Sequence, residues 1–211
     1  MKYILLIRHP ESTKNIFDKI GTLGSFQLSH KGIEQAYKVS HIIAKYYSDY
    51  LNNVLFVSSP EVRCYDACKL ISSTLNKSCI QLKLEPINSG ILNGLTKDEA
   101  KNKYPAIMEK EALYFDSKLD GYTLSYPEGE SIKDFQFRII NEMKYIFHNN
   151  EYTHFILILH QSVITAIINY FKHVQSQFPI YPFNRIDLCS FSEIVYQENK
   201  LTVNYINKHF V

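Results

Sequence analysis

The chain has 211 residues, of which 45% are hydrophobic, enough for one soluble globular domain with a full-sized core. Its 23 basic residues nearly balance its 21 acidic residues, which gives a formal net charge of +2. This charge balance gives no electrostatic basis for binding nucleic acid or an anionic membrane.

The N-terminus and the cysteines indicate the compartment. The apolar run at residues 3–7 is shorter than a secretory signal or a membrane span requires. The four cysteines (Cys64, Cys68, Cys79 and Cys189) include no C-x-x-C pair, so a zinc site is poorly supported. We therefore expect a cytoplasmic protein with reduced thiols and without a metal or cofactor.

Short aliphatic runs alternate with helical patterns along the chain. The first run, at residues 2–8, predicts a buried strand, and Ser29 is a candidate N-cap for the first helix. Strands are predicted at 2–8, 53–58, 78–84 and 153–159, helices at 31–50, 61–75, 131–148 and 162–174, and a closing hairpin at 188–196 and 201–206. This alternation predicts an α/β fold, with a mostly parallel sheet covered by helices on both faces.

Residues 88–129 are less regular. Short helical pieces at 97–103 and 105–116 precede a loop, and aromatic residues are frequent throughout the second half of the stretch. We interpret the stretch as an insertion within a single domain of residues 1–211. It is either a packed insertion or a lid over a substrate, and the sequence favours neither. Glu130 and Ser131 are expected to cap and orient the following helix.

Two predicted buried strands end directly in histidine, at His9 and His160. Ligands of open parallel sheets bind beyond the carboxyl ends of the strands, so the two histidines are expected to face one crevice. Arg8 precedes His9, and Arg63 lies at the start of the helix after the second strand. Because arginine offers a fixed fork of donors that matches phosphate oxygens, these four residues predict a cradle for a dianion.

Several segments, in order along the chain, resemble the histidine phosphatase superfamily, the phosphoglycerate mutase-like clan. The family's Arg-His-Gly-Glu mark, followed by an Asn, is similar to Arg8-His9-Pro10-Glu11 with Asn15. Other matching positions are Leu28-Ser29 with Gly32, Gln35 and Ala36; Ser58-Ser59-Pro60 with Arg63; Gly90 to Leu95; Pro127 to Ser131 with Arg138; the strand that ends at His160; and Asn207. The resemblance covers nearly the whole chain and implies a three-layer α/β/α fold.

The resemblance also implies a mechanism. His9 would attack phosphorus and form a phosphohistidine, which water then hydrolyses. Arg8, Arg63 and His160 would bind the phosphoryl oxygens, and Asn15 would add a polar donor. A carboxylic acid would protonate the leaving alkoxide, since an alkoxide leaves poorly without a proton.

Three positions depart from the family's pattern. The family often has a Glu four residues before the glycine that matches Gly90, but this position is Pro86. A loop shifted by one residue would let Glu85 serve as the acid; Asp66 and Glu11 are weaker substitutes. Pro10 and Gln161 each replace a glycine that follows a histidine. Pro10 removes an amide donor, and Gln161 either narrows the pocket or donates to a ligand.

We therefore expect a phosphatase for small phosphate esters, with no nucleic-acid or membrane partner. The oligomeric state stays open, and the resemblance implies a homodimer as one candidate. Two alternatives stay open. A phosphoglycerate mutase-like phosphotransferase would return the phosphoryl group to the substrate. A catalytically impaired phosphate-binding or regulatory module would have lost its acid.

Overall fold

The computed structural model describes residues 1–21, 26–116, 118–148, 151–173, 185–198 and 200–210. The strands are β1 (Lys2–Arg8), β2 (Val54–Ser58), β3 (Cys79–Gln81), β4 (His154–Leu159), β5 (Phe191–Gln197) and β6 (Lys200–Lys208). The helices are α1 (Thr13–Phe17), α2 (His30–Tyr46), α3 (Val62–Thr74), α4 (Lys97–Lys103), α5 (Pro105–Phe115), α6 (Ile132–His148) and α7 (Gln161–His173). Three short 3₁₀ helices are η1 (Ser48–Asn52), η2 (Gly90–Leu92) and η3 (Gly121–Thr123).

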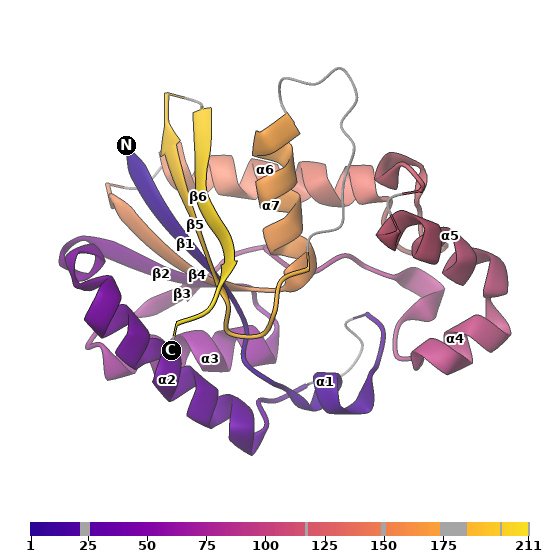
Figure 1. Ribbon diagram of the computed structural model, residues 1–211, viewed down its shortest axis with the longest axis horizontal. Coiled ribbons are helices and arrows are strands. Elements are labelled where there is room, and N and C mark those ends of the chain that lie inside the picture. The colour runs from indigo at the N-terminus through magenta and orange to yellow at the C-terminus, as the bar shows by residue number, and fades with distance from the viewer. Residues whose placement is uncertain (22–25, 117, 149–150, 174–184, 199, 211) are drawn as a thin grey trace.

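The six strands form one sheet in the order β3-β2-β4-β1-β5-β6 (Figure 1). The pairs β3–β2, β2–β4 and β4–β1 are parallel, whereas β5 is antiparallel to both β1 and β6. Among the described strands, only β5 therefore runs against the others. This arrangement confirms the predicted α/β class with a mostly parallel sheet.

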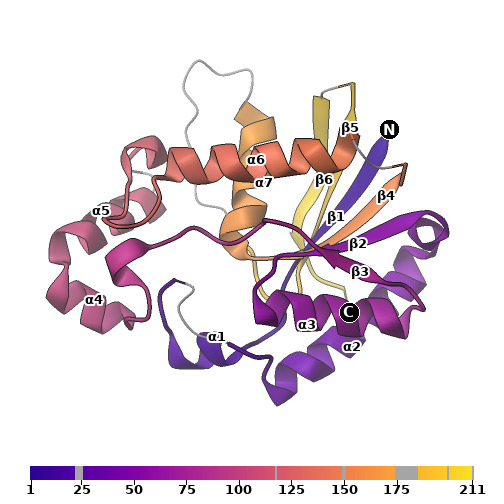
Figure 2. The same cartoon turned by 180° about the vertical axis from the view of Figure 1, so that it is seen from behind.

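Helices cover both faces of the sheet. Because side chains alternate along a strand, Leu5 and Ile7 of β1 pack on the face covered by α2 and α3. Ile4 and Leu6 pack on the opposite face, with α6 and α7. Figures 1 and 2 show these helix pairs on the two sides of the sheet. The three layers confirm the expected three-layer α/β/α architecture.

Three elements differ from the predictions. The helix predicted at 31–50 ends at Tyr46, because Tyr47 leaves helical geometry with φ −133° and its amide closes the last turn on Ile43. β3 is shorter than predicted and pairs with β2 over three residues only. Helix α1 was not predicted, since its five residues are too few to show an apolar period. Residue 174, the predicted end of the last helix, lies outside the described residues.

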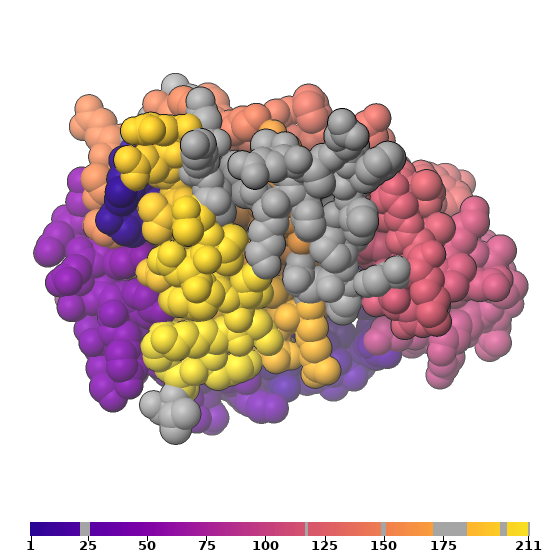
Figure 3. Space-filling model, turned by 45° about the horizontal axis from the view of Figure 1, so that its top comes forward, coloured from indigo at the N-terminus to yellow at the C-terminus, as the bar shows by residue number. Residues whose placement is uncertain are grey.

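Residues 88–129 contain η2, α4, α5 and η3, and α4 and α5 form one end of the molecule (Figure 3). The loop that leads into this segment packs closely against residues 127–129. A Cβ on Gly90 would lie 1.8 Å from the carbonyl oxygen of Pro127, and Gly90 has a φ of +51°. Glycine is therefore required at this crossing. No described helix is long and apolar enough to cross a membrane.

Phe155 in β4 offers a test of the core on the α6 side. It is 0% exposed, and its ring lies 5.6 Å from the ring of Phe147. We expect Phe155→Ala to lower the free energy of unfolding by about 3–5 kcal/mol, because it leaves a cavity in a packed core. Urea unfolding followed by circular dichroism measures this change. The control Phe137→Ala, at a side chain that is 69% exposed, should change stability by less than about 0.5 kcal/mol.

Candidate active site

Parallel pairing brings the two strand-end histidines together. β1 and β4 are neighbours, with Arg8 opposite Leu159, so the residues that follow them reach the same edge of the sheet. The ring centroids of His9 and His160 are 5.2 Å apart, with an interplanar angle of 66°. Both side chains are 4% exposed.

Arg63 reaches the same edge of the sheet from the side of β4 that faces away from β1. β2 pairs with β4, and α3 begins shortly after β2, so Arg63 in the first turn of α3 lies beside His160. The guanidinium is 1% exposed. Its Nη1 donates to Glu61 Oε2 at 3.1 Å, and its Nη2 donates to His160 Nδ1 at 3.2 Å. A buried cation with one carboxylate partner raises the electrostatic potential of the whole edge.

His9 is held as a neutral base. Its Nδ1 lies 2.7 Å from the carbonyl oxygen of Pro10, and because a carbonyl only accepts, Nδ1 carries the proton. The lone pair is therefore on Nε2. Burial and the charge of Arg63 hold the pKa of His9 well below its usual value, so the ring is neutral at pH 7. An unprotonated imidazole nitrogen is the form that can attack phosphorus.

His160 has the opposite tautomer. Its Nδ1 accepts from Arg63, so Nε2 carries the proton and donates to Ser59 Oγ at 3.0 Å. Burial and the nearby Arg63 hold its pKa well below the ordinary value as well. The ring is neutral here. A phosphate dianion beside it would favour the charged form and provide a second N–H donor.

Arg8 is positioned by the C-terminal half of the chain. Its Nη1 donates to Gln161 Oε1 at 3.0 Å and to the carbonyl oxygen of Ile186 at 2.5 Å. The turn after Ile186 is held by Asn207, whose Oδ1 accepts from the amide of Asp187 at 2.7 Å and whose Nδ2 donates to its carboxylate at 3.0 Å. Two residues singled out in the sequence, Gln161 and Asn207, therefore orient Arg8.

Asn15 is the third residue of the short helix α1. Its Oδ1 accepts from the amide of Ser12 at 3.0 Å and from the Ser12 hydroxyl at 2.8 Å. Within the described chain its Nδ2 has no partner, and the residue lines the cavity described next. The amide is therefore oriented with its donor available to a ligand.

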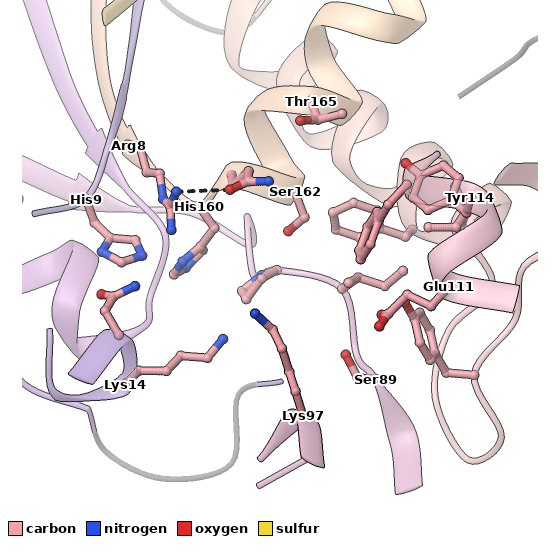
Figure 4. A pocket seen from close by; sticks show the side chains of 18 of the residues that line it. Arg8, His9, Lys14, Ser89, Lys97, Glu111, Tyr114, His160, Ser162 and Thr165 are labelled. Carbon is pink, nitrogen blue, oxygen red and sulfur yellow. Dashed lines mark hydrogen bonds between the residues drawn. The ribbon is translucent and has the colours of Figure 1, made fainter. Parts of the chain in front are cut away.

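These residues surround a cavity of about 320 Å³ (Figure 4), a size suited to a small molecule. One end is lined by Arg8, His9, Lys14, Asn15, Arg63 and His160. The other end is lined by Glu111 and by a group of aromatic rings, among them Tyr114, Phe115, Tyr126 and Phe135. The cavity thus joins a cationic end to an aromatic end.

Sequence reasoning missed three charged residues of this cavity: Lys14, Lys97 and Glu111. Lys14 directly precedes Asn15 in the motif that begins at Arg8. This position could have indicated that Lys14 lines the cavity. Lys97 and Glu111 lie on α4 and α5 and had no signal beyond their place in the segment interpreted as an insertion, either packed or a lid. Burial raises the pKa of Glu111, while a 2.6 Å hydrogen bond from the Tyr126 hydroxyl opposes the shift.

The structure does not bring Glu85 to the cavity, and the one-residue shift of the loop is absent. Pro86 lines the cavity instead. The Glu85 carboxylate is 41% exposed and lies 3.4 Å from Arg138 Nη1. Arg138 also binds both carboxylate oxygens of Glu130, at 2.8 and 3.0 Å, and this ion-pair cluster holds the loop in register.

The two weaker substitutes are also absent from the cavity lining. The Glu11 carboxylate accepts from Ser29 Oγ at 2.8 Å and pairs with Lys31 at 3.1 Å. Asp66 is exposed on α3. In contrast, the expectation for Ser131 is confirmed, since its hydroxyl accepts from the amide of Asp134 at 3.0 Å and caps α6.

A family model described as the histidine phosphatase superfamily (branch 1) matches residues 4–209. The chain belongs to this superfamily.

Two curated relatives illustrate the range of the superfamily. A fructose-2,6-bisphosphatase of Saccharomyces cerevisiae is 28% identical over 177 residues, or 83% of this chain and 35% of that protein. The chain therefore spans about a third of the length of that relative. A 2,3-bisphosphoglycerate-dependent phosphoglycerate mutase of Buchnera aphidicola is 27% identical over 200 residues, with 81% of this chain and 83% of that protein covered.

Solved structures share the fold at low sequence identity. A mycobacterial glucosyl-3-phosphoglycerate phosphatase in complex with VO3 superposes with a TM-score of 0.82 and 17% identity, covering 99% of this chain and 100% of that chain. An alpha-ribazole phosphatase from Shigella flexneri gives a TM-score of 0.79 and 17% identity, with 98% and 96% covered. These likenesses establish the architecture.

The position of Glu85 predicts a modest structural effect when it is replaced. Glu85→Gln should lower the free energy of unfolding by less than about 1 kcal/mol, because its ion pair with Arg138 is partly exposed. Its effect on kcat should be the same for phosphate esters with good and with poor leaving groups. Steady-state kinetics on both kinds of ester measure this. A loss confined to poor leaving groups would restore Glu85 as the acid.

The neutral histidines predict that stability depends on pH. Because the folded state lowers the pKa of His9, the unfolded chain binds the proton more readily, and stability falls as pH drops below about 6.5. Each such histidine contributes a slope of up to about 1.4 kcal/mol per pH unit. Urea unfolding at pH 7.5 and 5.5 should therefore show that His9→Asn loses less stability than the wild type when the pH is lowered. The control His41→Asn, at an exposed position, should lose as much as the wild type.

Proposed function

We propose that this chain is a phosphatase that hydrolyses monoesters of small phosphorylated molecules through a phosphohistidine on His9. One observation carries the proposal. The Pro10 carbonyl accepts a hydrogen bond from Nδ1–H of His9, so the lone pair of the ring is on Nε2. His9 lines a cavity that Arg8 and Arg63 also line. Membership of the histidine phosphatase superfamily supports the same conclusion.

In the first step, His9 Nε2 forms a bond to phosphorus while the bond from phosphorus to the ester oxygen breaks. Arg8 and Arg63 bind the phosphoryl oxygens, and Asn15 donates a further hydrogen bond from Nδ2. These donors are already in place, so little reorganisation is needed as charge builds up. In the second step, water attacks phosphorus, the bond to His9 breaks and inorganic phosphate leaves.

The charge of the cavity fits a dianion. Within the described chain, four cationic side chains line the cavity (Arg8, Lys14, Arg63 and Lys97), against the single carboxylate of Glu111. Glu61 adds one negative charge beside Arg63. With both histidines neutral, the cavity keeps an excess of positive charge, which a phosphate ester neutralises.

The two replaced glycines are compatible with this chemistry. Pro10 has no amide proton, but its carbonyl sets the tautomer of His9. Gln161 accepts a hydrogen bond from Arg8, and so orients the guanidinium rather than blocking the cavity. Neither replacement removes a group on which the proposed steps depend.

A mutase is the second candidate, because the phosphoglycerate mutase of Buchnera aphidicola matches over most of its own length. A mutase would return the phosphoryl group from His9 to a bound alcohol, whereas a phosphatase gives it to water. Incubation with 3-phosphoglycerate distinguishes the two by the product: 2-phosphoglycerate for a mutase, inorganic phosphate for a phosphatase.

The proposal predicts that His9→Ala abolishes turnover of p-nitrophenyl phosphate, with a fall in kcat of at least about a thousandfold, because the covalent route is lost. Labelled substrate quenched in acid should leave no label on the variant. The matched control His41→Ala, outside the cavity, should keep the wild-type rate. Turnover that survives in His9→Ala contradicts the proposal. A wild-type chain that binds vanadate but hydrolyses no ester would instead be a binding module.

A further inference from the structure

The proposed reaction lacks a carboxylic acid at the scissile bond. The position that would carry it is Pro86, and Glu85 is held outside the cavity by its ion pair. Glu11 and Asp66 do not line the cavity either. An ester with a basic leaving group nevertheless needs a proton at its bridging oxygen. Another side chain near His9 must therefore supply it.

Glu111 is the only carboxylate among the described residues that line the cavity, but it belongs to the aromatic end. It lies on α5 and accepts from Tyr126, and the cation that most influences it is Lys97. Figure 4 shows Glu111 across the cavity from His9. Glu111 is therefore placed to contact the alcohol part of a substrate, not the phosphoryl group.

Lys14 has a proton that it can transfer, and it lies at the end of the cavity that holds His9. It is the second residue of α1, directly before Asn15, and it lines the cavity together with His9. In Figure 4 its side chain lies on the same side as His9, with its end directed into the cavity. Its charge lowers the pKa of both His9 and His160, so it acts on the same small volume. Within the described chain, Lys14 makes no hydrogen bond or ion pair.

We propose that Lys14 is the proton donor to the leaving group, in place of the carboxylic acid that this chain lacks. The inference rests on the proposed phosphatase function and adds a catalytic residue to it.

The step balances without any further reactant. As His9 Nε2 bonds to phosphorus and the ester bond breaks, the Lys14 ammonium gives one proton to the departing oxygen, and the product leaves as a neutral alcohol. Lys14 is then a neutral amine. When water attacks the phosphohistidine, this amine takes one proton from the water as its oxygen bonds to phosphorus. His9 leaves with the electron pair of the bond to phosphorus, so both side chains return to their starting states.

The surroundings of Lys14 suit this exchange. Burial lowers its pKa to about 8, and the charges of Arg63 and Arg8 act in the same direction. Glu61 and the Cys64 thiol face it as well and oppose the shift. Lys14 is therefore protonated at neutral pH, yet it gives up its proton far more readily than an ordinary lysine. A general acid is most effective when its pKa lies close to the working pH.

The test compares two esters that both present an aromatic ring to the cavity. p-Nitrophenyl phosphate has a good leaving group that departs without a proton, whereas benzyl phosphate releases a basic alkoxide. We expect Lys14→Met to lower kcat on benzyl phosphate by about 10²–10³-fold, and on p-nitrophenyl phosphate by less than about tenfold. Lys14→Arg should show the same contrast, because the guanidinium keeps its positive charge but does not release a proton.

The pH profile gives an independent readout. For the wild type on benzyl phosphate, kcat/KM should fall above about pH 8, as Lys14 loses its proton. This decrease in kcat/KM above about pH 8 should be absent for p-nitrophenyl phosphate, and absent in both variants. The control Lys38→Met removes a lysine from the exposed face of α2 and should leave both rates unchanged.

The outcomes separate this inference from the proposed function. Equal losses on the two esters, or recovery of benzyl phosphate hydrolysis in Lys14→Arg, would show that Lys14 contributes only its charge and would overturn the inference. If the wild type does not hydrolyse p-nitrophenyl phosphate at all, the proposed function is overturned. Unfolding midpoints of both variants exclude misfolding, and phosphohistidine formed by Lys14→Met from p-nitrophenyl phosphate shows that its site is intact.

Discussion

Arg63 carries its charge in a position where the fold leaves only 1% of the side chain exposed. Its field reaches every reactive group of the site. After burial itself, Arg63 is the largest influence that lowers the pKa values of His9, Lys14 and His160. One buried guanidinium therefore keeps two histidines neutral and makes a lysine more acidic. The protonation states that the proposed attack and the proposed proton transfer require therefore have a common cause.

This arrangement is costly until a ligand arrives. Removing a cation from water is unfavourable, and Glu61 and His160 are the partners that Arg63 has in return. Arg8 is partly buried, with neutral partners in Gln161 and the Ile186 carbonyl. The hydrophobic layers on both faces of the sheet hold these charges in place. A dianion bound between these cations would supply negative charge and so offset part of this cost.

The sequence was informative where function depends on local order. β1 and β4 are continuous aliphatic runs, so their ends, and hence His9 and His160, could be placed from the pattern alone. Arg63 followed from its position after β2. Two features depended on contacts between distant residues. The register of the loop at Glu85 is set by Arg138 and Glu130 from α6 and the turn before it. The direction of Lys14 is set by α1, a helix of five residues that begins with side-chain capping rather than with an apolar period.

The link from Asn207 through Asp187 to the backbone that holds Arg8 has a consequence for how the chain matures on the ribosome. β1 is made first, but it lies in the middle of the sheet between β4 and β5, and Arg8 is oriented by residues near position 186 and position 207. A nascent chain therefore contains His9 long before the cavity forms around it. The cationic end of the cavity is therefore complete only after the last strand has been made and paired with β5.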